Sequence, residues 1–120
     1  MGYPFAAAGR PGLLWDSGIG VGRTYVAFAQ QAGDLLGVPT GLVYNERLGG
    51  SDVDLAVFQH FTQKLYDRYC NTNNHILHDF LRGLLLASIV MLENGGGSIA
   101  RTAKDEYGLL DDRDAYVRSM

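Results

Sequence analysis

The sequence predicts a mainly α fold: a small three-helix domain with a short N-terminal arm or β-hairpin and a charged C-terminal tail. Apolar residues recur at helical spacing in three segments, and clusters of glycine, proline or asparagine separate those segments. The chain of 120 residues is 47% hydrophobic and 19% charged, a balance that suits one folded domain with its own core.

We expect a single domain over residues 1–120, divided into an arm or hairpin at 1–16, a helical core at 17–94 and a tail at 95–120. In the arm, two short β-compatible pieces flank the turn-forming cluster Gly9-Arg10-Pro11-Gly12. Because a two-stranded hairpin is marginal without a surface to pack on, an irregular arm is the alternative. The tail mixes charged residues with few apolar ones, which is typical of a docked or partly mobile extension.

The first helix is predicted from about residue 20 to residue 36, where apolar residues recur at helical spacing and most polar residues fall elsewhere. Gly37 and Pro39 follow it and are typical of a helix end. Asp16 or Ser17 is expected to cap its beginning.

The three alternating glycines Gly18, Gly20 and Gly22 raise the question of nucleotide binding. A dinucleotide fingerprint has its third glycine three residues after the second, and Arg23 or Tyr25 occupies that position here. No second strand is expected after the first helix, so we expect no nucleotide cofactor. The glycines instead indicate a flexible entry that lets the helix approach a neighbouring element closely.

The second helix is predicted to begin at Ser51-Asp52-Val53-Asp54, which resembles a capping box. A third helix follows and ends at Asn94 and the glycines after it. The apolar stripe of the second helix consists of Leu55, Phe58, Phe61, Leu65 and Tyr69.

A break between these two helices is favoured at Asn71-Thr72-Asn73-Asn74. An unbroken helix from Asp52 to Glu93 would be about 60 Å long, whereas a domain of this size is about 35 Å across. The four Asn and Thr residues also cost roughly 2 to 3 kcal/mol in a helix interior. We therefore expect Asn73 or Asn74 to cap the third helix, with one continuous helix as the alternative.

Composition excludes several classes of function. The net charge is -3 and no stretch concentrates Lys or Arg, so nucleic acid is not an expected partner. The apolar stretch from Leu84 to Leu92 is shorter than the roughly 20 residues of a membrane span, and no secretory signal begins the chain. The single Cys70 forms no intramolecular disulfide and suits the reducing cytoplasm, so we expect a soluble cytoplasmic protein.

Metal binding and nucleophilic catalysis receive little support. His75 and His78 lie three residues apart with Asp79 beside them, so two imidazoles and a carboxylate could bind one metal ion. The helical phase places them opposite the leucines, where solvated residues belong, so we expect no metal. Ser88 has no G-x-S-x-G turn around it, and we expect a buried serine rather than a nucleophile.

Aromatic and amide side chains form the candidate ligand site. Tyr and Asn on an apolar seam can orient a small ligand through a few hydrogen bonds, or equally cap a helix and fix its register. A tryptophan anchors an arm on the helices or lies in an interface. The candidates are Tyr25, Tyr66, Tyr69, Asn73 and Trp15.

Self-association is expected because the second and third helices carry wider apolar faces than the first helix can cover. A two-fold dimer is the first choice for such a homo-oligomer. The candidate interface residues are Phe58, Phe61, Leu85 and Ile89.

Two resemblances accompany these patterns. The run from Leu13 to Val26, together with residues 65–69 and 83–93, resembles small uncharacterised proteins of actinobacteria over most of the chain, which implies no activity. Tyr107-Gly108-Leu109-Leu110-Asp111 is similar to the Tyr-x-x-x-Asp/Glu signal of type VII secretion substrates, which are helical hairpins. Those substrates carry Trp-x-Gly in the hairpin turn, whereas Trp15 here precedes the first helix.

The function expected from the sequence is therefore that of a non-catalytic helical binding or scaffold protein, acting through self-association or a protein partner without a cofactor. The alternative is a cofactor-independent enzyme or small-molecule binder with a pocket between the helices, and a type VII secretion substrate is a minor alternative. A cavity near Tyr25, Tyr69 and Asn73 would favour the enzyme or ligand binder, and tight packing there would favour the scaffold.

Overall fold

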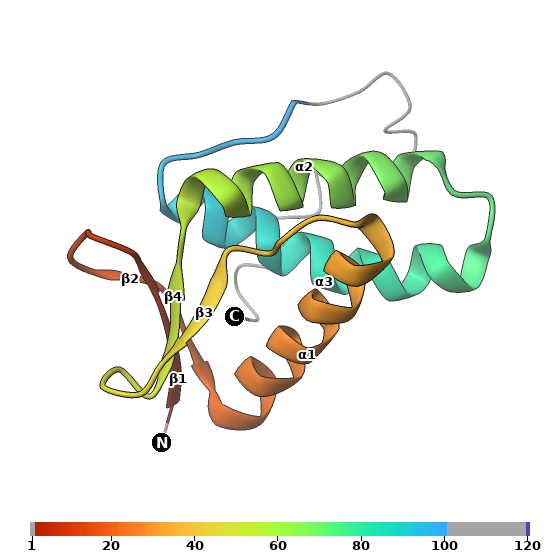
Figure 1. Ribbon diagram of the computed structural model, residues 1–120. Helices are drawn as coiled ribbons and strands as arrows, with labels where there is room; N and C mark the ends of the chain where they lie inside the picture. The colour runs from red at the N-terminus through yellow and green to blue at the C-terminus, as the bar shows by residue number, and fades with distance from the viewer. Residues whose placement is uncertain (1, 101–119) are drawn as a thin grey trace.

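The computed structural model describes residues 2–100 and residue 120. Along the chain, two strands and a helix are followed by two more strands and then by two helices (Figure 1). The elements are β1 (Gly2–Ala7), β2 (Leu13–Gly18), α1 (Ile19–Leu36), β3 (Leu42–Asn45), β4 (Gly50–Val53), α2 (Leu55–Asn71) and α3 (His75–Asn94).

The four strands form one mixed sheet in the order β2-β1-β4-β3. Two antiparallel hairpins lie side by side, and their inner strands β1 and β4 pair in parallel, with Phe5 opposite Ser51. The three helices lie on one side of this sheet (Figure 1). The mainly α, three-helix bundle expected from the sequence is therefore wrong, because the chain has an α/β fold.

The second hairpin accounts for this error. Residues 37–50 looked like a linker, yet they contain β3 and the start of β4. Ser51 does not begin a capping box, because it lies within β4. Asp54 alone caps α2, and its carboxylate accepts a hydrogen bond from the Val57 N–H at 3.3 Å.

The N-terminal segment forms a hairpin of β1 and β2, and the irregular arm that the sequence left as an alternative does not occur. The hairpin gains the packing surface it needs from β4 at its edge and from the helices on its face. Alternation along β1 places Tyr3, Phe5 and Ala7 in the core, while Pro4 on the opposite face is only partly buried.

The ends of α1 were predicted in part. Gly37 ends the helix in the left-handed conformation with φ 70°, as expected of a C-terminal glycine. The beginning differs, because Gly18 is the capping residue and no side chain caps the helix. Ser17 instead donates its hydroxyl hydrogen bond to the Tyr3 carbonyl at 2.9 Å, which ties β2 to β1.

The break between α2 and α3 is confirmed. Asn74 caps α3, since its side-chain oxygen accepts a hydrogen bond from the Leu77 N–H at 3.0 Å. The two helices consequently fold back on one another (Figure 1), within overall extents of 41 × 28 × 25 Å.

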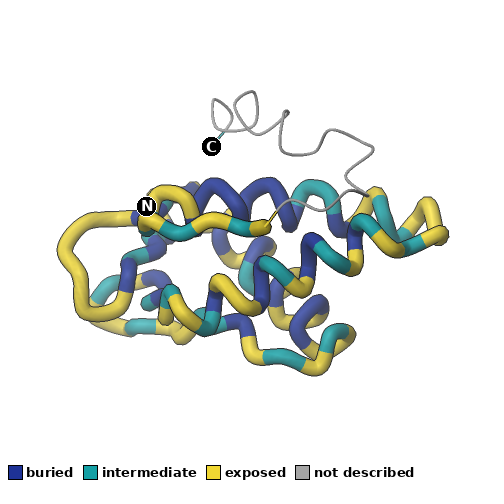
Figure 2. Tube along the Cα trace, turned by 90° about the horizontal axis from the view of Figure 1, so that it is seen from above, coloured by how far each residue is buried: buried dark blue, intermediate teal, exposed yellow. Residues whose placement is uncertain are grey.

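The C-terminal half of α3 is the centre of the core: every residue from Leu84 to Leu92 is buried (Figure 2). With 20 residues and a mean hydropathy of 1.5, the whole of α3 is long and apolar enough to cross a membrane. In the 18-residue stretch of α3 that has this mean hydropathy, 56% is buried inside the protein. The central helix of a globular core has the same properties, so α3 is weak evidence for a membrane span.

Candidate functional site: an apolar groove between two helices

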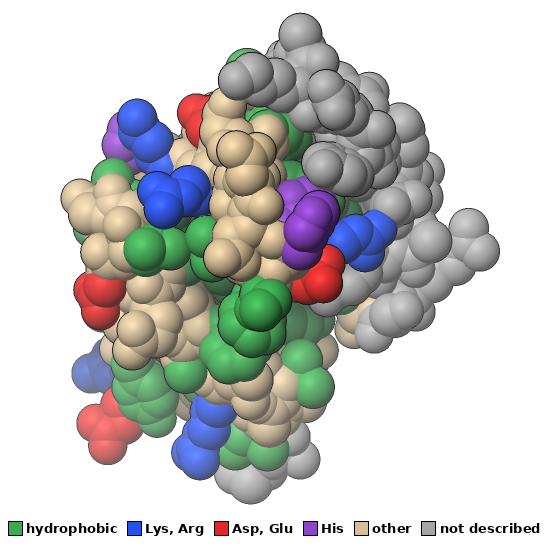
Figure 3. Space-filling view, turned by 90° about the vertical axis from the view of Figure 1, so that its right-hand side faces the viewer, with side chains coloured by type: hydrophobic (Ala, Val, Ile, Leu, Met, Phe, Trp, Pro, Cys, Tyr) green, Lys and Arg blue, Asp and Glu red, His purple; other side chains and the backbone are tan. Residues whose placement is uncertain are grey.

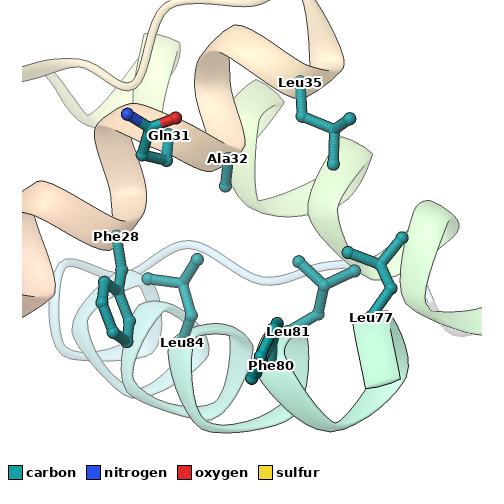
Figure 4. A pocket seen from close by; sticks show the side chains of 8 residues that line it. All are labelled: Phe28, Gln31, Ala32, Leu35, Leu77, Phe80, Leu81 and Leu84. Atoms are coloured by element: carbon teal, nitrogen blue, oxygen red, sulfur yellow. The ribbon is translucent and has the colours of Figure 1, made fainter. Parts of the chain in front are cut away.

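A groove of about 490 Å³ runs between α1 and α3 (Figure 4). Each wall is one face of a helix, with side chains at positions i, i+4 and i+7. The groove is lined by Phe28, Gln31, Ala32 and Leu35 from α1 and by Leu77, Phe80, Leu81 and Leu84 from α3.

The floor of the groove is buried and its rim is open. Leu81 and Leu84 belong to the core, whereas the exposed fractions of Phe28, Leu35 and Phe80 are 58%, 49% and 72%. Ile76, one helical turn before Phe80, is also exposed at 67%. Large apolar side chains thus gather on the end of the molecule that carries the α2–α3 turn, beside a histidine and an acidic side chain (Figure 3).

The groove carries no charge. Gln31 is the only polar residue among the eight that line it, and the other seven are aliphatic or aromatic. Its walls therefore suit a neutral, apolar occupant, because a charged group would lose its hydration there without gaining a partner.

A buried hydrogen-bond chain joins α1 to α3. The hydroxyl of Ser88 donates to the Leu84 carbonyl at 2.8 Å, so the Tyr25 hydroxyl, 2.7 Å away, is the donor to Ser88 Oγ. Burial raises the pKa of Tyr25 well above its ordinary value, and the hydrogen bond with Ser88 offsets part of that rise. Tyr25 is therefore neutral and structural at physiological pH.

A family model described as "Family of unknown function (DUF6086)" matches residues 1–120. The chain belongs to this family. No curated protein and no solved structure matches it. Membership of the DUF6086 family agrees with the resemblance to uncharacterised proteins.

The five candidate ligand residues do not form a pocket in this DUF6086 family member. Tyr25 and Trp15 do meet, with their rings edge to face at 5.7 Å, but both pack around Phe5. Tyr66 and Tyr69 are buried on α2, and Asn73 is exposed in the α2–α3 turn. The groove between α1 and α3 contains none of them.

The four candidate interface residues are placed in the core. Phe58, Phe61, Leu85 and Ile89 are fully buried within the chain, because the sheet and the neighbouring helices cover the apolar faces of α2 and α3. A surface for self-association must therefore consist of other residues. Phe28 and Leu35 are exposed apolar residues of α1 and are available for such a surface.

The histidines show no metal site: within residues 2–100 and 120, no group of three His, Cys, Asp or Glu side chains could hold a metal ion. His75 and Asp79 are exposed, and the ring of His78 stacks on Tyr69 at a centroid distance of 3.8 Å. Desolvation lowers the pKa of His78, while the carboxylate of Asp79 opposes this effect.

Of the three glycines, Gly22 serves packing. A Cβ on Gly22 would lie 2.6 Å from the Tyr3 Cβ, so the glycine lets α1 approach β1 closely. The expectation of no strand after the first helix is wrong, since β3 follows α1. However, β2 and β3 lie at opposite edges of the sheet, whereas the strands of a dinucleotide-binding unit are adjacent.

The secretion-like motif at Tyr107 to Asp111 lies outside the residues that the structure describes. Trp15 lies on β2, and the turn between α2 and α3 contains Thr72 and Asn73 instead of a tryptophan.

Proposed function

We propose that this protein is a non-catalytic binding protein that docks an apolar surface of a protein partner into the groove between α1 and α3. The observation that carries this proposal is the uncharged groove lining combined with a rim of exposed Phe28, Leu35 and Phe80. Contiguous exposed apolar side chains of this size are typical of interaction sites.

Binding is favoured over catalysis by the chemistry of the lining. General acid–base or nucleophilic catalysis requires a titratable or nucleophilic side chain at the reacting group. None of the eight lining residues provides one. Tyr25 and Ser88 lie about one helical turn beyond the groove, but both are buried and engaged in one hydrogen-bond chain.

A protein surface is favoured over a small molecule by the shape of the groove. Its volume of about 490 Å³ suits a small ligand, but small-molecule pockets bury about 70–90% of their ligand. Here the rim side chains are half or more exposed, so a small ligand would leave much of the apolar rim in water. Two helix walls with side chains at i, i+4 and i+7 instead resemble the grooves that accept an apolar helix face.

The test is binding of the uncharged apolar dye Nile red to dilute protein. Phe28→Ser and Phe80→Ser change exposed rim residues, and Tyr44→Ser is the matched control because Tyr44 is an exposed aromatic residue on β3. We expect each rim variant to weaken dye binding at least several-fold and the control to retain it. Equal binding by wild type and both rim variants would exclude the groove as a binding surface.

We further propose that the protein acts in the cytoplasm as one of the small actinobacterial proteins it resembles, where its single Cys70 forms no intramolecular disulfide. The minor alternative, a type VII secretion substrate, is supported by the similarity of Tyr107 to Asp111 to the secretion signal. Loss of export on replacing Tyr107 and Asp111 by Ala would favour this alternative.

A further inference from the structure

The exposed flank of α1 beside the groove carries an apolar stripe. Val21, Phe28 and Leu35 follow one another at seven-residue intervals, and Val21 is exposed at 59%, much like the other two. The inward face of the same helix is already buried through Tyr25 and Ala29. A helix with apolar residues every seven positions on an exposed face is suited to packing against another helix.

We propose that a second copy of this chain covers this outer stripe (Val21, Phe28 and Leu35), with the two α1 helices antiparallel about a two-fold axis at Phe28. The inference rests on the proposed function, because it names the partner of the same groove. Phe28 is the midpoint between Val21 and Leu35, so antiparallel pairing brings Val21 against Leu35 of the partner subunit. Phe28 then meets Phe28 of the partner subunit, a self-complementary arrangement that two-fold symmetry requires.

The charge distribution along α1 fits this pairing. The residues between the stripe positions on the same face are Thr24 and Gln31, both uncharged. At about 100° per residue, the charged Arg23 and Asp34 fall on the other side of the helix. Along α1, two copies of a chain with a net charge of -3 therefore pair without opposing like charges.

The exposed apolar area also approaches what a dimer needs. The stripe together with Ile76 and Phe80 exposes on the order of 500 Å² per chain, if each large side chain offers about 150–200 Å² in full. A specific interface buries about 800 Å² per partner. The flanking polar residues, Thr24 and Gln31 among them, would supply part of the remainder.

Analytical ultracentrifugation of the full chain over micromolar concentrations tests the pairing. We expect the wild type to sediment as a dimer of the 13.1 kDa chain. Phe28→Glu places two carboxylates together at the axis and should give a monomer, whereas Tyr44→Glu on β3 should remain a dimer. A monomeric wild type at 100-fold higher concentration than the dye assay would overturn the proposal.

A charge pair tests the antiparallel register. Val21→Lys and Leu35→Glu should each raise the dimer dissociation constant at least ten-fold, and the double variant should recover most of that loss. Within one helix these positions are about 21 Å apart, too far for an ion pair in the same chain. Failure of the double variant to recover, in a chain that does dimerise, would contradict the pairing of the α1 helices.

The two proposals fail differently. A monomer that still binds Nile red through Phe28 and Phe80 would refute the second copy as the partner and retain the groove as a binding site. A monomer whose dye binding is insensitive to both rim variants would refute both proposals.

Discussion

The hydroxyl of Tyr25 lies 2.7 Å from Oγ of Ser88, and this contact links α1 to α3 about one helical turn beyond the groove residues Phe28 and Leu84. The hydroxyl of Ser88 is committed to the Leu84 carbonyl at 2.8 Å, so the bond to Tyr25 has a fixed donor. Two helices that share few other polar contacts are thereby held at the separation that forms the groove.

The direction of this bond predicts unequal effects of removing its two ends. Tyr25→Phe deletes the donor and leaves Ser88 bonded to Leu84, which should cost about 1 kcal/mol in the free energy of unfolding. Ser88→Ala leaves the buried Tyr25 hydroxyl without its acceptor and should cost about 2 kcal/mol. Urea unfolding of both variants and the double variant measures the difference, and equal costs would contradict the assigned donor.

Burial of Tyr25 also predicts a dependence of stability on alkaline pH. Burial raises the pKa of the folded phenol above the ordinary value of about 10, while in the unfolded chain the phenol ionises near that value. The unfolded state therefore loses its proton first, and stability falls as pH rises above about 10. Tyr25→Phe should flatten this fall when unfolding is followed between neutral and alkaline pH.

The local signals in the sequence were sufficient for the end of α1 and the beginning of α3. Gly37 and Asn74 act through their own backbone or side chain within a few residues, so their roles are visible without the fold. The same holds for the α2–α3 break, where neighbouring Asn and Thr residues compete with the helical backbone.

The sheet depended on pairing between distant segments. Ser51 on β4 pairs with Phe5 on β1, and the residues around Ser51 carry no local signal of a partner so far away in the chain. Strands of four residues also show too little alternation to be recognised. Without the sheet, nothing in the predicted fold covers the apolar faces of α2 and α3. The sequence therefore predicts that Phe58 and Leu85 lie in an interface.

The groove was missed for a related reason. Phe28 and Leu35 recur at helical spacing with Tyr25 and Ala29, so periodicity alone predicts one apolar face for all four. The structure divides them, because a helix buries only the side that meets its neighbours.

The cap of α3 gives a prediction with a neighbouring control. Asn74→Ala removes the side-chain acceptor of the Leu77 N–H and should cost about 1 kcal/mol in the free energy of unfolding. Asn73→Ala changes an exposed residue of the same turn and should have little effect. Equal losses in thermal or urea unfolding would show that the turn, and not the Asn74 cap, sets the stability.

Two glycines of the same run should respond in opposite directions to alanine. A Cβ on Gly22 meets Tyr3 of β1, whose own position is fixed by burial and by the bond from Ser17, so Gly22→Ala should cost about 1–3 kcal/mol through overpacking. A Cβ on Gly20 meets no heavy atom within 4 Å, so Gly20→Ala should stabilise the helix by about 0.5 kcal/mol. Urea unfolding of the two variants compares these effects in one helical turn. Because the run lacks the spacing of a dinucleotide fingerprint, neither variant should change the dependence of stability on added ATP or NAD. Stabilisation of the wild type by micromolar nucleotide that Gly20→Ala abolishes would contradict this expectation.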